Sequence, residues 1–193
     1  MAEGSKFLNE DVMDIKYPTE CSDSKEVFSM WKNFRKEVIE CLKKTPADQF
    51  TVSPEEGRWS ISEVGEHLYI TQWNIARAVP IILSGRGNAL FGGYEKEPDY
   101  RMIKITLMKP SGVKHPPAVA PLSKYSFEEL LPLLNKAESK LEDTLLKHTK
   151  AELMKYKMEH PYFGDLHIFD FIWVMGMHEN SHLSALKSRT KDF

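Results

Sequence analysis

The stretch DLHIFDFIWVMGMHENSHLSALK, residues 165–187, combines an apolar helical pattern with two histidines. Apolar side chains recur in it every three or four residues, as they do on the buried face of an α-helix. His178 and His182 are four residues apart, so a helix places both imidazoles on one face, one turn apart. Neutral imidazole is the commonest metal ligand, and this spacing lets both rings reach one ion. The alternative interpretation is a pair of hydrogen-bonded histidines in the core or at its rim.

The segment HENSH, residues 178–182, also fits the H-E-x-x-H pattern of zinc proteases, in which the glutamate is the general base. The extended form of that pattern requires Gly and His where Ala185 and Ser188 stand. The sequence therefore argues against a protease, and any third ligand is expected upstream. Glu179 follows His178 by only about 100° of helix turn. We predict a packing or ligand-supporting role for it ahead of a catalytic one.

Three more helices are predicted upstream. Apolar residues recur with helical spacing over residues 24–44, with Ser24 as a possible N-cap. Ser60 and Glu63 form a capping box that begins a second helix, which Pro80 is expected to kink or end. A second capping box at residues 126–129 begins a third helix.

Residues 85–124 follow no helical period and contain several glycines and five prolines. A connection of this length within a compact domain is usually functional or disordered. We expect an ordered excursion over one end of the bundle, because Tyr94, Tyr100 and Leu107 would bury area. The predicted fold is all-α: a four-helix bundle with a long crossover between helices 2 and 3. Residues 1–23 are expected to form an N-terminal arm, and residues 24–190 the bundle domain.

Length, charge and composition restrict the class of protein. The 193 residues suffice for one well-buried domain, and 26 basic against 28 acidic residues leave no field that would recruit nucleic acid. No apolar run approaches the roughly 20 residues of a membrane span. Cys21 and Cys41 have neither metal-ligand spacing nor the pattern of a disulfide framework. We expect a cytoplasmic protein that acts on a small molecule, without nucleic acid or membrane.

A third histidine lies on the second predicted helix. His67 falls on or beside its buried stripe, and bundles build metal sites from inward side chains on facing helices. His67 could therefore meet His178 and His182 near one end of the core. Glu63 could hydrogen-bond the His67 imidazole, although Ser60 competes for it. Thr71 and Asn74, further along the same face, are predicted to line a pocket.

Three motifs resemble those of the DinB-like superfamily of bacterial four-helix bundles. They are WSISEVGEHL at residues 59–68, HPYFG at residues 160–164 and HENSHL at residues 178–183. The resemblance spans about residues 25–187 and implies a mononuclear divalent metal on His67, His178 and His182. It also implies homodimers, and either thiol-dependent transferases and isomerases or hydrolases. This sequence departs from the family pattern at Asn180, Ser181 and Ala185, which leaves the substrate class open.

Two functions from different classes remain. The first is a metal-dependent enzyme, a low-molecular-weight-thiol-dependent transferase or a hydrolase, in which Zn, Ni or Fe activates a thiol or water. The second is a non-catalytic binding module, whose histidines bind a structural metal or none.

Overall fold

A computed structural model describes residues 15–108, 116–122 and 125–191 of the chain. Residues 1–14 of the predicted arm lie outside the described residues, as do 109–115 and 123–124 of the predicted crossover and 192–193. The rest of the arm packs on the bundle. The Lys16 carbonyl accepts the indole N–H of Trp173 at 2.8 Å, and Pro18 is buried in the 3-10 helix η1 (Pro18–Glu20).

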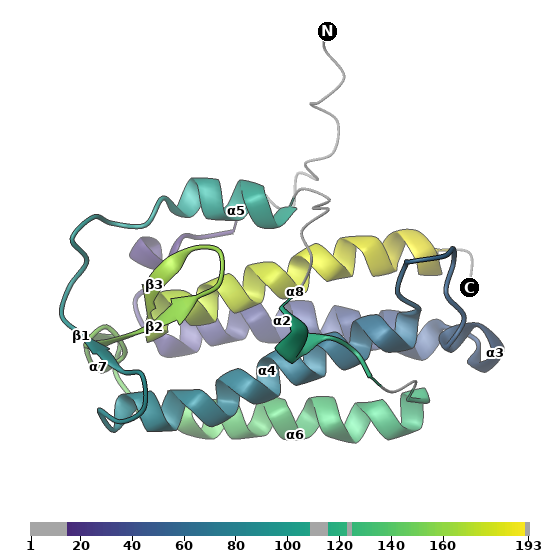
Figure 1. Ribbon diagram of the computed structural model, residues 1–193, viewed down its shortest axis with the longest axis horizontal. Coiled ribbons are helices and arrows are strands. Elements are labelled where there is room, and N and C mark those ends of the chain that lie inside the picture. Colours follow the sequence, from purple (N-terminus) through teal and green to yellow (C-terminus); the bar gives the residue numbers. More distant parts are fainter. Residues whose placement is uncertain (1–14, 109–115, 123–124, 192–193) are drawn as a thin grey trace, which may run out of the picture.

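Four long helices form the predicted bundle: α2 (Ser24–Lys44), α4 (Ile61–Leu83), α6 (Phe127–Leu145) and α8 (Ile168–Thr190). Figure 1 shows that α2 and α8 run in one direction, whereas α4 and α6 run in the other. These two parallel pairs pack most closely. Gly65 permits the close approach of α4 and α6, because a Cβ at this position would lie 2.4 Å from Leu130 Cδ2.

Capping residues define the starts of these helices. Both predicted capping boxes are present, Ser60 with Glu63 on α4 and Ser126 with Glu129 on α6. The N-cap of α2 is Asp23, whose carboxylate accepts the Glu26 amide at 2.9 Å, so the prediction of Ser24 was wrong by one residue. Pro80 does not end α4, which continues to Leu83.

The connection from α4 to α6 returns along the bundle, as two parallel neighbouring helices require (Figure 1). It contains strand β1 (Leu90–Phe91), helix α5 (Tyr100–Met108) and the 3-10 helix η2 (Pro117–Val119). Helix α5 packs against α8, with Tyr100 and Leu107 against the core. Periodicity did not reveal α5, because this helix is only nine residues long.

A small antiparallel sheet, ordered β1-β2-β3, adds to the all-α bundle. Strand β2 (Tyr156–His160) follows the short helix α7 (Lys150–Leu153) and pairs with β3 (Gly164–His167), with Lys157 opposite His167. Gly164, the first residue of β3, directly follows the turn between the strands and has a φ of +69°, which glycine adopts readily. The strands themselves were not predicted because they are only two to five residues long.

Apolar side chains fill the bundle in two clusters. The larger cluster surrounds Trp31, Phe169 and Trp173, and the smaller one surrounds Leu42, Leu68 and Leu134. The short helix α3 (Ala47–Phe50) contributes to the smaller cluster through Phe50. Cys21 and Cys41 are buried free thiols. Within the described residues, no helix is both long and apolar enough to cross a membrane.

Candidate metal centre

The structure brings the three predicted histidines together. His67 comes from α4, and His178 and His182 come from successive turns of the antiparallel helix α8. The Nε2 atom of His178 lies 3.2 Å from Nε2 of His67 and 3.2 Å from Nε2 of His182. One ligand atom from each ring lies within 4.8 Å of the other two. Three imidazole nitrogens therefore converge between the two helices.

Hydrogen bonding sets the tautomer of His67. Its Nδ1 lies 2.8 Å from the carbonyl oxygen of Val119, which can only accept, so Nδ1 carries the proton. In the neutral ring, Nε2 then presents a lone pair toward His178. One proton on Nε2 of His178 cannot form a well-aligned hydrogen bond to His67 and His182 together. A cation at the point of convergence would satisfy all three nitrogens.

The surroundings favour neutral rings. Burial lowers the pKa of His178 well below its ordinary value, and the neighbouring His182 and His67 lower it further. Burial, with a smaller contribution from His67, lowers the pKa of His182 to about 3. Both rings are thus unprotonated near neutral pH, the form that binds metals.

Two of the three separations between the ligand nitrogens fit a bound metal ion. Zinc–imidazole bonds are about 2.0–2.1 Å long, so octahedral or tetrahedral angles separate two ligand nitrogens by roughly 2.8–3.4 Å. Both Nε2 separations to His178 are 3.2 Å. Three histidines leave coordination positions for water or substrate.

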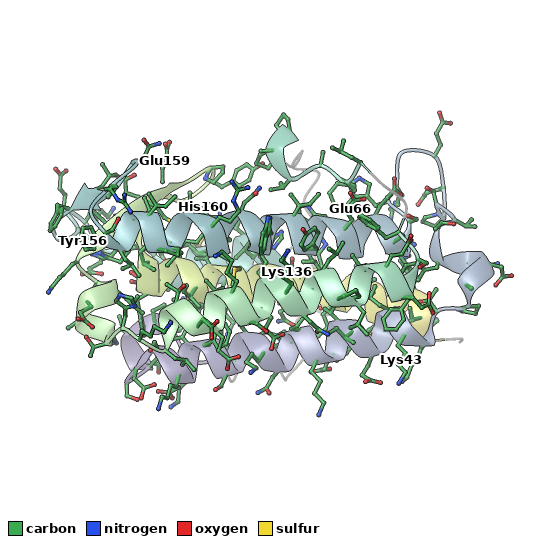
Figure 2. The ribbon with its side chains drawn as sticks, turned by 90° about the horizontal axis from the view of Figure 1, so that it is seen from below. Lys43, Glu66, Lys136, Tyr156, Glu159 and His160 are labelled. Atoms are coloured by element: carbon green, nitrogen blue, oxygen red, sulfur yellow. The ribbon has the colours of Figure 1, made fainter. Side chains whose placement is uncertain are left out.

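Residues 118–122, named here the strap, lie along α4 beside His67. Asn74 Nδ2 donates to the Ala118 carbonyl at 3.4 Å, and the Val119 carbonyl receives the bond from His67. Further along the strap, the Leu122 amide donates to Glu66 Oε1 at 3.1 Å. Figure 2 shows Glu66 on α4, on the side of the helix along which the strap runs.

Neither predicted carboxylate partner lies free at the site. Glu63 accepts the Ser60 amide at 2.7 Å in the capping box, and Val119 takes the position predicted for Glu63 beside His67. Glu179 is buried, and both of its oxygens accept from the Arg35 guanidinium on α2. This ion pair makes Glu179 a core residue and gives it no role as a base.

The predicted pocket residues differ in their surroundings. Asn74 is exposed and bonds the strap. The hydroxyl of Thr71, one turn beyond His67, is buried without a hydrogen-bond partner among the described residues. Thr71 is thus a polar group near the triad that an added ligand could engage, whereas Asn74 serves the strap.

His160 belongs to the hairpin. Its Nδ1 accepts the Tyr162 amide at 3.2 Å, and its ring stacks on Phe163 with centroids 4.7 Å apart. Burial lowers its pKa to about 4. These contacts explain its place in the HPYFG motif as packing.

Sequence reasoning missed three groups around the triad. Glu66 is only 2% exposed. Its position next to His67, a predicted ligand on the buried stripe of the helix, was a signal in the sequence that could have identified it. The Trp59 ring packs against that of His67, with the two ring centroids 4.8 Å apart. The Val119 carbonyl carries no side-chain signal at all.

Known proteins share this fold. The model of the DinB superfamily matches residues 30–186. TT2238, described as a four-helix bundle protein, superposes with a TM-score of 0.55 at 19% identity, over 86% of this chain and 98% of its own. YfiT from Bacillus subtilis, described as a probable metal-dependent hydrolase with an unusual four-helix bundle topology, gives a TM-score of 0.57 at 12% identity, over 87% of each chain. No curated protein matches the chain.

Proposed function

The chain belongs to the DinB superfamily, and from this membership together with the site we propose that His67, His178 and His182 bind one divalent metal ion. The observation that carries the proposal is the convergence of three Nε2 atoms, with both separations to His178 at 3.2 Å. Zn, Ni and Fe all suit an imidazole donor set.

We further propose that the protein is a metal-dependent enzyme acting on a small molecule. When bound, the ion would supply Lewis acidity that lowers the pKa of water or of a low-molecular-weight thiol. Water as nucleophile makes the protein a hydrolase, the class named in the description of YfiT, and a thiol makes it a transferase. We retain residues 24–190 as the proposed domain, and a cytoplasmic homodimer as the proposed assembly.

The protein's own groups would prepare the site for this chemistry. Val119 orients His67, and the Trp59 ring covers one side of that imidazole. The buried hydroxyl of Thr71 is available to hold a substrate oxygen or sulfur.

Metal content tests the binding proposal. We expect one equivalent of divalent metal per chain in the purified protein, and its loss in His67→Ala and His178→Ala. His148→Ala is the matched control. His148 lies beyond the end of α6, where its Nδ1 lies 2.8 Å from the Thr144 carbonyl oxygen, so this substitution should leave the metal content unchanged. Stoichiometric metal retained in both triad variants would refute the site.

A second function is favoured by the hydrogen bonds of the two glutamates that adjoin the ligands in sequence. Glu179 is paired with Arg35, and Glu66 accepts the Leu122 amide. A triad supported in this way also suits a structural metal in a non-catalytic binding module. Assays of the metal-loaded protein with model electrophiles, with and without thiols, separate the two functions. Metal that raises the melting temperature but supports no turnover favours the structural role.

A further inference from the structure

The strap is fixed to α4 on both sides of the carbonyl that orients His67. On one side, the Asn74 side chain donates to the Ala118 carbonyl at 3.4 Å, next to the η2 turn in which the Val119 amide donates to Pro116 O at 3.1 Å. On the other side, the Leu122 amide donates to Glu66. The direction of the Val119 carbonyl therefore depends on both attachments.

Glu66 provides the stronger attachment of the two that α4 side chains make apart from His67. It is 2% exposed, and its Oε1 lies 3.1 Å from the Leu122 nitrogen. Hydrogen bonds to a carboxylate are roughly twice as strong as neutral ones. The other attachment, from Asn74, is longer at 3.4 Å and exposed to solvent. Removing Glu66 should therefore release the strap more than removing Asn74.

The orientation of His67 matters because a ligand imidazole is held by the group that accepts from its other nitrogen. Loss of such a partner typically costs 10–100-fold in metal affinity. The Val119 carbonyl is that partner, at 2.8 Å from Nδ1. A backbone carbonyl cannot be removed by a side-chain substitution. The residues that hold the strap in place can be substituted instead.

We propose that Glu66 is a positioning residue of the metal centre: by holding the Leu122 amide, it fixes the strap so that the Val119 carbonyl keeps His67 in the Nδ1–H tautomer with Nε2 directed at His178. This inference rests on the proposed function, namely that the triad binds a metal. It adds a residue that acts through the strap and the Val119 carbonyl.

The first experiment measures Zn²⁺ affinity by competition with a chromophoric chelator. Glu66→Ala should weaken binding about 10–100-fold. Glu66→Gln keeps an oxygen that can accept the Leu122 N–H and should remain within a few-fold of the parent protein. Asp170→Asn is the matched control. Asp170 is another buried acid that holds the same long connection, through Tyr94, but it touches none of the three histidines. Its Zn²⁺ affinity should not change.

The second experiment removes the same hydrogen bond from the strap. Leu122→Pro deletes the N–H, and no packing is lost because the Leu122 side chain is 90% exposed. Leu122→Ala keeps the N–H and is its control. If Glu66 acts through this amide, Leu122→Pro should weaken Zn²⁺ binding in the parent and add little in Glu66→Ala. Additive losses would overturn the proposed connection.

A spectroscopic measurement separates positioning from general destabilisation. In metal-free protein, ¹⁵N chemical shifts report which nitrogen of His67 carries the proton. The parent protein and Glu66→Gln should show the Nδ1–H form, whereas Glu66→Ala should show a mixture. An unchanged tautomer and an unchanged affinity in a folded Glu66→Ala protein would overturn the inference. A parent protein that binds none of Zn²⁺, Ni²⁺ and Fe²⁺ would instead refute the proposed function.

Discussion

At the scale of single residues, burial decides what a charged side chain does. Arg35 and Glu179 are 1% and 2% exposed, and Arg35 Nη2 donates to Glu179 Oε2 at 2.9 Å. The guanidinium also lies over the Trp31 ring, 5.2 Å from its centroid. Glu179 stands where a zinc protease has its base, yet this pairing makes it part of the core.

This role predicts a loss of stability on breaking the pair. Glu179→Gln would leave the Arg35 charge buried without a counterion, which costs roughly 3–5 kcal/mol in the free energy of unfolding. The double variant Arg35→Met, Glu179→Met should recover most of it. Urea denaturation measures both, and metal content should stay at the parent level. A stable Glu179→Gln protein that has lost its metal or turnover would contradict the structural role.

At the scale of elements, the first turn of α8 is capped by the long connection. The Tyr94 hydroxyl donates to Asp170 Oδ2 at 2.5 Å and accepts the His167 amide at 2.8 Å. Burial raises the pKa of Asp170 to about 6, although the bonds from Tyr94 and Tyr100 act against this rise. Among the charged groups nearby, Glu97 raises it and Lys150 lowers it.

Because the pKa of Asp170 is raised in the folded protein, its contribution to the free energy of unfolding depends on pH. The folded protein binds the Asp170 proton more tightly than the unfolded chain, whose carboxyl has its ordinary value of 3.8. The resulting stabilisation is fully present below that value and is lost as the pH rises through about 6. Between pH 5 and 8 the parent should lose roughly 1–2 kcal/mol that Asp170→Asn does not lose. Urea denaturation of both proteins at several pH values measures the difference, and parallel curves would contradict it.

At the scale of the whole molecule, the three histidines join the two parallel helix pairs. Close packing lies within the α2–α8 and α4–α6 pairs, whereas His67 and His178 face each other across α4 and α8. A bound ion would therefore link the two halves of the bundle in the folded state only.

This arrangement predicts stabilisation by metal. Free Zn²⁺ at about 100 times its Kd should add about 2.7 kcal/mol by mass action. For a chain of this length, each kcal/mol raises Tm by about 2–4 °C, so the shift should be roughly 5–10 °C. Calorimetry with Zn²⁺ and then chelator measures it. His178→Ala should show no shift, and an equal shift in that variant would place the ion elsewhere.

Features that depend on residues a few positions apart could be predicted from the amino-acid sequence. Helical periodicity and two capping boxes gave the four long helices of the bundle, because these hydrogen bonds close within three or four residues. The same local geometry placed His178 and His182 on one face. The three motifs predicted the family, and the match of the DinB superfamily model to residues 30–186 confirmed it.

Contacts between groups far apart in the chain could not be predicted in this way and depend on how the helices pack. Arg35 and Glu179 are 144 positions apart, and His67 and Val119 are 52 apart. Such contacts depend on how each helix is rotated and where the connection returns, and no local pattern encodes either. A backbone carbonyl such as that of Val119 has no side chain to reveal it. The hydrogen bonds that orient His67 and hold the strap on α4 therefore depend on the tertiary structure.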